Sequence, residues 1–221
     1  MPEFPRRNNV VKTVAIDVGF PGAGRVLKEG QKLGLWDLCT PQLVEPADVY
    51  ILSAWHPMYD SLLPHLDGRV VVCWTSSAGE MGFEPIECGY FNQILNNSRI
   101  ERVWCGDRAL GQVNKKCFYS PYPLKYFERE PAPKELWIGL FSPGTKKKNL
   151  VNQAVAAALV QKDHDLLMVT NCSLPAGLLA AIGVRMRLHT WLPEADYQNI
   201  LSACRLNLAV SWAETFNYQA A

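Results

Sequence analysis

The sequence predicts an α/β protein whose sheets are parallel and covered by helices on both faces. Short β-rich apolar runs alternate with longer helical stretches, and most of the runs are apolar throughout rather than alternately polar and apolar. Continuous hydrophobic strands are typical of parallel sheets that are buried on both faces. Their alternation with helices predicts a doubly wound, Rossmann-like arrangement.

Two sets of strand-forming segments follow one another along the chain. Both are rich in β-branched and apolar residues, as in Val-Val-Val-Cys-Trp at 70–74. The predicted strands are 10–18, 48–54, 69–75, 102–105 and 116–120 in the first set, and 136–141, 165–170, 184–189 and 205–210 in the second. Helices are predicted between them at 24–35, 59–66, 83–97, 107–113, 149–161, 174–182 and 195–203.

A proline-rich stretch separates the two sets. Residues 120–133 contain Pro121, Pro123, Pro131 and Pro133, which lack backbone N–H donors and favour extended backbone. This stretch is typical of an interdomain linker. We therefore predict two Rossmann-like domains: residues 1–130, ending in the linker, and residues 131–221, in which the second domain is incomplete.

Composition narrows the functional class. The chain has 22 Lys+Arg against 21 Asp+Glu, a net charge of +1, which gives no global field for nucleic acid or an anionic membrane. The odd total of seven scattered cysteines, without a Cys-x-x-Cys motif, indicates buried reduced thiols more than disulfides or a metal site. No signal core or membrane-spanning run is present, so we expect a cytoplasmic protein.

The first domain offers a glycine-containing loop, residues 19–24, between its first strand and its first helix. Gly19, Gly22 and Gly24 follow the first strand, where glycine permits close backbone approach and a helix N-terminus can face an anion. Their spacing does not match the dinucleotide fingerprint. A tight turn without a ligand and an anion or acceptor site are both consistent with the segment.

Two polar residues follow other strands of the first domain. His56 comes after strand 48–54, and Ser76 comes after strand 69–75. Ligands of α/β sheets bind at the carboxyl ends of the strands, so both residues are candidates for the acceptor side of a site. A structural histidine is the alternative for His56.

The second domain carries a basic loop. Lys146, Lys147 and Lys148 lie between strand 136–141 and helix 149–161. Lysine is a suitable point-charge partner for phosphate, although the spacing is not that of a Walker A loop. A solvated surface run is the alternative.

The end of the chain carries a second candidate site. Glu214 follows strand 205–210, and Thr215, Phe216 and Asn217 begin a further predicted helix. A carboxylate can accept hydrogen bonds from sugar hydroxyls, and the free N–H groups after it can face a phosphate. A carboxylate that only stabilises the helix N-terminus is the alternative.

These segments together resemble the retaining GT-B glycosyltransferases, specifically glycosyltransferase family 4. The basic loop 148–150, the turn 190–193 and the Ser-x-x-Glu-Thr-Phe-Asn run 211–217 resemble the family's motifs in the same order. Residues 121–127 resemble its interdomain segment. The likeness is specific over about 115–221.

The resemblance implies a role for each candidate residue. Glu214 would contact the transferred sugar as the first Glu of a Glu-x7-Glu motif, and Lys148, with Lys146 or Lys147 in support, would hold the donor diphosphate. The amides of Thr215, Phe216 and Asn217 would approach sugar and phosphate, His189, Trp191 and Leu192 would border the base, and Gly22 and Gly24 would lie near phosphate and acceptor. Residues 1–130 would be the acceptor-side domain and 131–221 a partial donor-binding domain.

The sequence also departs from the family. Pro143 stands where an Arg usually helps the Lys, and Thr215 and Asn217 replace glycines. The second Glu of the motif would fall one position beyond Ala221. We therefore expect a chain truncated at its carboxyl end and inactive by itself.

The predicted function is retaining transfer of a sugar from a nucleotide-diphosphate donor to a glycan, lipid or small-molecule acceptor, without a metal or other cofactor. The missing Arg and the compact first domain favour a rival, a non-catalytic α/β protein that binds a nucleotide or sugar phosphate. An oxidoreductase is disfavoured because the dinucleotide glycine fingerprint and the ribose-binding acid are lacking.

Overall fold

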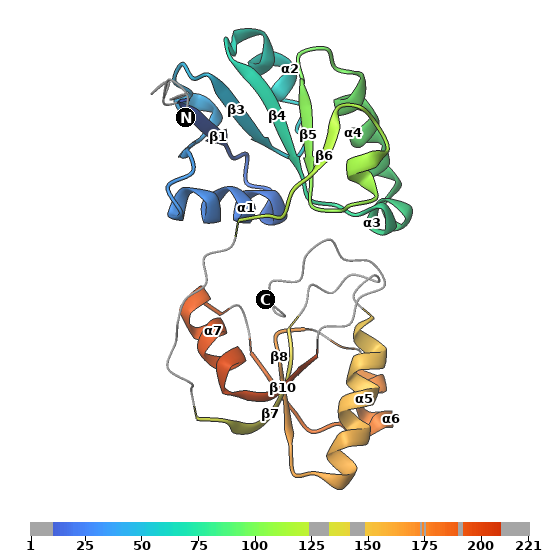
Figure 1. The fold of residues 1–221 in the computed structure, drawn as a ribbon. Coiled ribbons are helices and arrows are strands. Elements are labelled where there is room, and N and C mark those ends of the chain that lie inside the picture. Colours follow the sequence, from blue (N-terminus) through green and yellow to red (C-terminus); the bar gives the residue numbers. More distant parts are fainter. Residues whose placement is uncertain are drawn as a thin grey trace, which may run out of the picture. The chain divides into compact units, whose positions relative to one another are not determined.

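The computed structural model describes residues 11–123, 133–141, 149–172, 174, 176–189 and 192–208, which fall in two compact units, 1–126 and 127–221 (Figure 1). Each unit contains one sheet in which every described strand pair is parallel. The predicted α/β class with two Rossmann-like sheets is confirmed. The domain limits 1–130 and 131–221 and the acceptor-side and donor-binding roles stay predictions.

Unit 1 has a six-stranded sheet in the order β2-β1-β3-β4-β5-β6. Its elements are β1 (Thr13–Ile16), α1 (Pro21–Lys32), β2 (Asp37–Cys39), η1 (Pro41–Leu43), β3 (Val49–Ser53), α2 (Tyr59–Leu62), η2 (Leu63–His65), β4 (Arg69–Trp74), α3 (Ala78–Phe83), α4 (Pro85–Asn96), β5 (Arg102–Cys105), η3 (Leu110–Gln112) and β6 (Cys117–Tyr119). The chain runs from β1 outward to β2 on one side and then crosses to β3 on the other.

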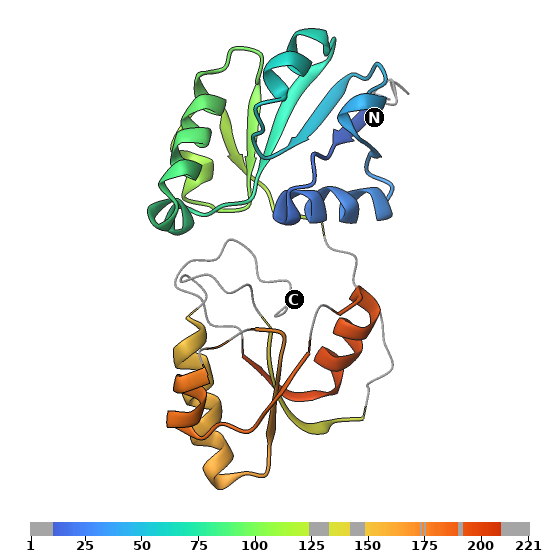
Figure 2. The same cartoon turned by 180° about the vertical axis from the view of Figure 1, so that it is seen from behind.

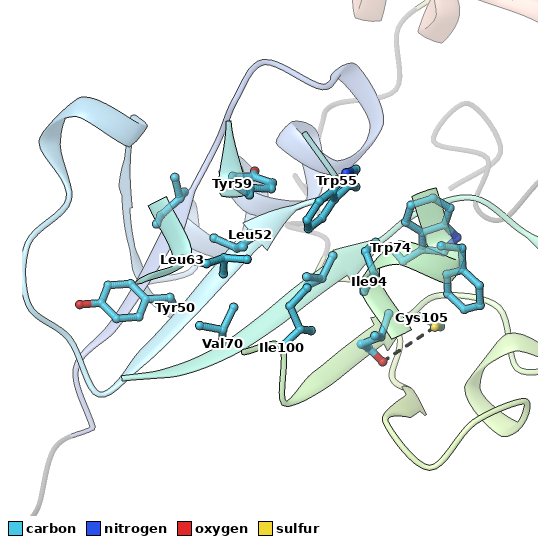
Figure 3. Packing of buried hydrophobic residues seen from close by; sticks show 14 of the residues in the cluster. Tyr50, Leu52, Trp55, Tyr59, Leu63, Val70, Trp74, Ile94, Ile100 and Cys105 are labelled. Carbon is cyan, nitrogen blue, oxygen red and sulfur yellow. Dashed lines mark hydrogen bonds between the residues drawn. The ribbon is translucent and has the colours of Figure 1, made fainter. Parts of the chain in front are cut away.

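The alternation of side chains along the strands divides the core of unit 1 into two layers. Val70, Val72 and Trp74 of β4 pack with Phe91 and Ile94 of α4 in one cluster (Figure 3). Between them, Val71 and Cys73 point to the opposite face. Helix α1 lies on the other side of the sheet from α4 (Figures 1 and 2). Burial on both faces explains why the strands are apolar throughout.

Unit 2 has a four-stranded sheet in the order β10-β7-β8-β9. Its elements are β7 (Glu135–Leu140), α5 (Leu150–Asp163), β8 (Leu167–Thr170), α6 (Ala176–Ile182), β9 (Met186–Leu188), α7 (Glu194–Ala203) and β10 (Cys204–Leu208). Helices α5 and α6 cover one face of the sheet, and α7 covers the other (Figure 2). On the first face, Ala154 and Ala157 of α5 pack against Ile138, Leu140 and Met168.

The structure corrects several of the predicted elements of unit 1, among them helix α3, which was not predicted. Helix α1 begins at Pro21 rather than at 24, because proline is tolerated at the first helical position, where its missing N–H has no partner to lose. Gly22 and Gly24 therefore lie in the first turn of α1 and not in a loop. The short strand β2 was not predicted, and η3 replaces the helix expected at 107–113.

Candidate functional site

In the sheet of unit 1, the direction in which successive strands are added reverses between β1 and β3. In doubly wound sheets, ligands bind outside the carboxyl ends of the strands where the chain reverses direction, and here β1 leads to one side and β3 to the other. The segments that leave these two strands are 17–20 and 54–57. A third segment, 75–77, leaves β4 beside them.

The first two segments are tied together by hydrogen bonds. The backbone N–H of Val18 donates to Oγ of Ser53 at 3.1 Å, and Ser53 is fully buried at the end of β3. The Tyr59 hydroxyl donates to the carbonyl oxygen of Ser53 at 3.2 Å. Burial first, and then the nearby charge of Asp17, raise the pKa of Tyr59 far above its usual value, so its hydroxyl remains a donor.

Asp17 is a half-buried carboxylate that the sequence reasoning missed. It directly follows β1, and its Oδ1 accepts the N–H of Gly19 at 2.9 Å. A Cβ added to Gly24 would lie 2.7 and 2.8 Å from the two carboxylate oxygens, so the carboxylate packs against the first turn of α1. The signal in the sequence is an acidic residue at the end of an apolar strand, two positions before Gly19. In the structure, Gly19 has φ +87°.

His56 lies where the sequence placed it, beside the segment that leaves β1. Its ring meets Phe20 edge to face at a centroid distance of 6.1 Å and Tyr59 at 6.4 Å. Its Nδ1 accepts the N–H of Met58 at 3.2 Å, so the neutral ring carries its hydrogen on Nε2. The ring is thereby held in one orientation with a donor to offer.

The turn that leads to His56 holds backbone strain. Ala54 has φ +53°, in the left-handed region that alanine rarely adopts, and its N–H donates to the carbonyl oxygen of Cys73 at 2.9 Å. Such strain costs about 1–3 kcal/mol and persists where surrounding contacts impose it. Here it turns the chain sharply between the buried residues Ser53 and Trp55.

The segment that leaves β4 also reaches α1. A Cβ added to Gly22 would lie 3.2 Å from Oγ1 of Thr75, so this hydroxyl already fills the space beside the helix. Ser76 follows, half-buried. The glycines predicted that another group comes close to the backbone at Gly22 and Gly24. In the structure, the protein's own side chains occupy that space. The structure gathers Gly22, Gly24 and His56 around one edge, with Ser76 next to Thr75.

The contacts at the ends of β4 and β5 are structural. The Tyr122 hydroxyl donates to the carbonyl oxygen of Trp74 at 2.6 Å and accepts the N–H of Gly106 at 2.8 Å. Oδ2 of Asp107 accepts the N–H of Ala78 at 3.0 Å, at the start of α3. These groups fix the segments that frame the site, and the start of the predicted linker is held to the sheet by Tyr122.

A hollow of about 540 Å³ lies at the opposite, amino-terminal edge of this sheet. Arg69 and Glu101 line it and form a two-pronged ion pair, with N–O distances of 2.8 and 2.6 Å. Because these charges neutralise each other, we do not assign a site there.

In the sheet of unit 2, the direction in which successive strands are added reverses between β7 and β10. These strands are neighbours, with Leu140 opposite Leu208 near their carboxyl ends. The predicted donor residues after them, Lys146, Lys147, Lys148, Glu214, Thr215, Phe216 and Asn217, lie outside the described residues, as does Trp191. What the fold establishes is that the two strands preceding these motifs are adjacent and parallel.

Two of the predicted base-bordering residues are described. The N–H of His189, just after β9, donates to the carbonyl oxygen of Thr170 at the end of β8, at 2.8 Å. Leu192 packs in the cluster on the α7 face with Phe141 and Tyr197. Both residues therefore lie near the carboxyl edge, and Leu192 also has a packing role.

The described parts of the chain contain no group of three or more His, Cys, Asp or Glu side chains arranged to hold a metal ion. No described helix is both long and apolar enough to cross a bilayer. The described cysteines carry no disulfide, and burial raises the pKa of Cys204 to about 11.

No family model and no curated protein matches the sequence. Solved structures do match the fold. A mutant of S. aureus TarM, in complex with fondaparinux, alpha-GlcNAc-glycerol and UDP, aligns with a TM-score of 0.60 and 14% identity, over 77% of this chain and 38% of that chain. A structure of OtsA without ligand aligns with a TM-score of 0.53 and 12% identity, over 88% of this chain and 57% of that chain.

The fold of this chain is therefore similar to the folds of TarM and OtsA. At these identities the similarity concerns the fold alone. The chain spans less than two thirds of the length of either protein.

Proposed function

We propose that this chain is part of a retaining glycosyltransferase of family 4 that uses a nucleotide-diphosphate sugar and needs no metal ion. One observation carries the proposal. In a GT-B fold, the two strands beside the reversal point of unit 2, β7 and β10, are the strands that precede the lysine loop and the Ser-x-x-Glu-Thr-Phe run. In the sequence, the family motifs therefore directly follow the two strands whose carboxyl ends form this edge of the sheet.

The chemistry follows from the proposed roles. The bond between the anomeric carbon and the diphosphate oxygen breaks, and a bond from that carbon to the acceptor oxygen forms on the same face. The proton of the acceptor hydroxyl passes to the departing phosphate oxygen. Lys148, with Lys146 or Lys147, stabilises the growing negative charge, and the amides of residues 215–217 add to it. Glu214 holds hydroxyl groups of the transferred sugar.

Unit 1 supplies the acceptor side in this proposal. Its reversal point brings together Asp17, His56 and Thr75, with Gly22 and Gly24 behind them in α1. The hydrogen bond from Val18 to Ser53 and the strained turn at Ala54 hold this edge in shape without a bound ligand.

The proposal is tested by measuring binding of the sugar donor, because binding can be detected even if the chain does not catalyse transfer by itself. Thermal unfolding is measured with a panel of nucleotide-diphosphate sugars and with the free nucleotides. A ligand at about 100 times its dissociation constant stabilises the folded state by about 2.7 kcal/mol. We expect one nucleotide sugar to raise the melting temperature and both Lys148→Ala and Glu214→Ala to remove most of that rise.

Matched controls are available in unit 2. Lys162 and Glu135 are exposed residues in α5 and β7, and Lys162→Ala and Glu135→Ala repeat the same charge changes away from the carboxyl edge. They should leave the ligand-induced rise unchanged. The proposal is wrong if no nucleotide sugar stabilises the protein, or if the controls weaken binding as much as the site variants.

The replacement of the usual Arg by Pro143 keeps a second function in view: binding of a nucleotide sugar without transfer. Release of free nucleoside diphosphate by the protein separates the two. Stoichiometric binding with no release over many hours supports the binding protein, and acceptor-dependent release supports the transferase.

A further inference from the structure

We propose that Tyr122 and Lys134 anchor the two ends of the connection between the units, so that only residues 123–133 act as the tether. The anchors are described side chains, one in each unit. The effective concentration at which one tethered module meets the other depends on the length of the tether. The inference goes beyond the proposed function, because it concerns the chain without any ligand.

The first anchor lies at the carboxyl ends of β4 and β5. The Tyr122 hydroxyl donates to the carbonyl oxygen of Trp74 at 2.6 Å and accepts the N–H of Gly106 at 2.8 Å. The ring is buried and meets Trp104 edge to face at a centroid distance of 5.3 Å. A Cβ added to Gly106 would lie 2.3 Å from a carbon of this ring, so the ring fills the space beside the glycine. Polar and apolar contacts therefore hold Tyr122 to two neighbouring strands.

Ser120, two residues before Tyr122, is held to the same sheet by other groups. The indole N–H of Trp104 donates to the carbonyl oxygen of Ser120 at 2.8 Å. The N–H of Ser120 donates to the carbonyl oxygen of Cys105 at 3.3 Å. Neither contact uses the Tyr122 side chain, so its loss moves the attachment point of the tether back to Ser120 and no further.

The second anchor lies in unit 2, at the end of α7. The Lys134 ammonium donates to the carbonyl oxygen of Ser202 at 2.7 Å and to that of Cys204 at 3.3 Å. Helix α7 has no basic residue in its own last turn, so Lys134 supplies the positive charge that the C-terminal end of a helix favours. The next residue, Glu135, lies opposite Cys204 in the ladder between β7 and β10. Without Lys134, the attachment point therefore moves to Glu135.

These attachment points set the reach of the tether. Positions 122 and 134 are twelve residues apart, and an extended chain spans about 3.5 Å per residue, so their Cα atoms can separate by at most about 42 Å. Moving the first attachment from Tyr122 to Ser120 adds about 7 Å to this limit. Moving the second from Lys134 to Glu135 adds about 3.5 Å. The first anchor thus has about twice the effect of the second.

The experiment measures distances between the units by double electron–electron resonance in the whole 221-residue protein without ligand. Nitroxide labels are attached through p-acetylphenylalanine at the exposed positions Gln31 of α1 and Ala156 of α5, which leaves the cysteines unmodified. We expect Tyr122→Ala to extend the long-distance end of the distribution by up to about 7 Å, and Lys134→Met by up to about 3.5 Å. Lys134→Arg keeps the charge and a donor and should match the wild type.

Matched variants keep the result readable. Tyr119→Ala in β6 and Lys162→Met in α5 make the same changes at exposed positions and should leave the distribution unchanged. Gly106→Ala leaves the tether sequence intact but places a methyl group where the Tyr122 ring lies, so it should reproduce the effect of Tyr122→Ala. It serves as the test of the first anchor if Tyr122→Ala does not fold by circular dichroism.

Two outcomes overturn the inference. The first is a distribution that is the same in the wild type and in the folded Tyr122→Ala or Gly106→Ala protein. The second is a Lys134→Met distribution that equals the wild type, or a Lys134→Arg distribution that is extended as far as that of Lys134→Met. Because no ligand is present, neither outcome depends on whether the protein binds a nucleotide sugar.

Discussion

The two sheets reverse direction at equivalent places, yet their carboxyl edges are built differently. In unit 1 the segments leaving β1, β3 and β4 contact one another through Val18 and Ser53, Phe20 and His56, and Gly22 and Thr75. In unit 2 the described contacts at the edge centre on β8: the N–H of His189 donates to the carbonyl oxygen of Thr170, and Sγ of Cys172 contacts the carbonyl oxygen of Leu140 at the end of β7. The segments that carry the donor motifs follow β7 and β10.

The cores of the two units differ in the size of the side chains that fill them. Unit 1 buries large aromatic side chains, including Tyr50, Tyr59 and Trp74, whereas unit 2 packs the small Ala154 and Ala157 of α5 against its sheet. The comparison teaches that the same parallel α/β arrangement can be filled by large aromatic side chains or by a helix face of small residues. The following changes test whether the two units respond independently.

The largest effect is expected for Gly68→Ala in unit 1. An added Cβ would overlap the carbonyl oxygen of Ala47 and lie 2.6 Å from that of Asp48. Backbone atoms cannot move aside as a flexible side chain can, so we expect a loss of about 3 kcal/mol in the free energy of unfolding. Hydrogen exchange should show faster exchange in β3 and β4 and unchanged exchange in β7 and β8.

A matched control exists in α4. Gly89 is exposed, and a Cβ there would meet nothing within 4 Å. Gly89→Ala should stabilise unit 1 by about 0.5–1 kcal/mol, because alanine is the better helix former. Equal stability of the Gly68→Ala protein and the wild type would show that the Gly68 turn is not tightly packed.

The corresponding change in unit 2, Gly139→Ala, should cost less. Its Cβ would overlap Oδ1 of Asn207 and lie 3.1 Å from Sγ of Cys204. The exposed Asn207 side chain can move, but it then loses its hydrogen bond to the carbonyl oxygen of Leu201, 3.1 Å away. We expect a loss of about 1–2 kcal/mol, measured by urea denaturation.

Asn207→Ala provides the double-mutant cycle. If the clash is with this side chain, Gly139→Ala should cost clearly less in the Asn207→Ala background than in the wild type. A cost that is the same in both backgrounds would assign the strain to Cys204 and Phe141 instead.

Tyr122→Phe tests the polar contacts that shape the edge of unit 1. The change removes the donor to the carbonyl oxygen of Trp74 and the acceptor for the N–H of Gly106. Two partly buried backbone groups lose a partner, so the free energy of unfolding should fall by about 1–2 kcal/mol. Tyr119→Phe, at an exposed position in β6, is the control and should change little in the same thermal melt.

The smallest effect concerns pH. The Arg69 guanidinium, hydrogen-bonded to Glu101, holds the pKa of that carboxyl below its usual value. A lowered pKa adds stability above the usual carboxyl range, and this stability disappears as the pH falls through the lowered pKa. Glu101→Gln should therefore melt slightly below the wild type at neutral pH, and the gap should close as the pH falls through the lowered pKa. A gap that widens in acid would contradict the assignment.

Much of the fold was predictable because burial on both faces leaves a clear mark on a strand. Runs such as 70–74 and 136–140 are strands in the structure. The short edge strand β2 was missed because it is only three residues long, with Asp37 exposed. Helix α1 was started too late because its early glycines suggested a loop, while Pro21 sets the true beginning.

The candidate site of unit 1 was predictable only in part. His56 and Ser76 could be placed by the rule that ligand-binding residues follow strands, and both lie at that edge. Asp17 was missed because one acidic residue after a strand has no distinguishing spacing. Its importance depends on the packing against Gly24 in the next element. The donor residues remain a prediction from sequence.

The sequence alone determined the parallel α/β class and the two sets of strands, because these depend on local periodicity and composition. Only the tertiary structure decided the order of the strands, and with it which loops share an edge. Strand order depends on contacts between residues far apart in the chain, such as Val18 with Ser53 and Gly22 with Thr75. No local pattern encodes those pairings.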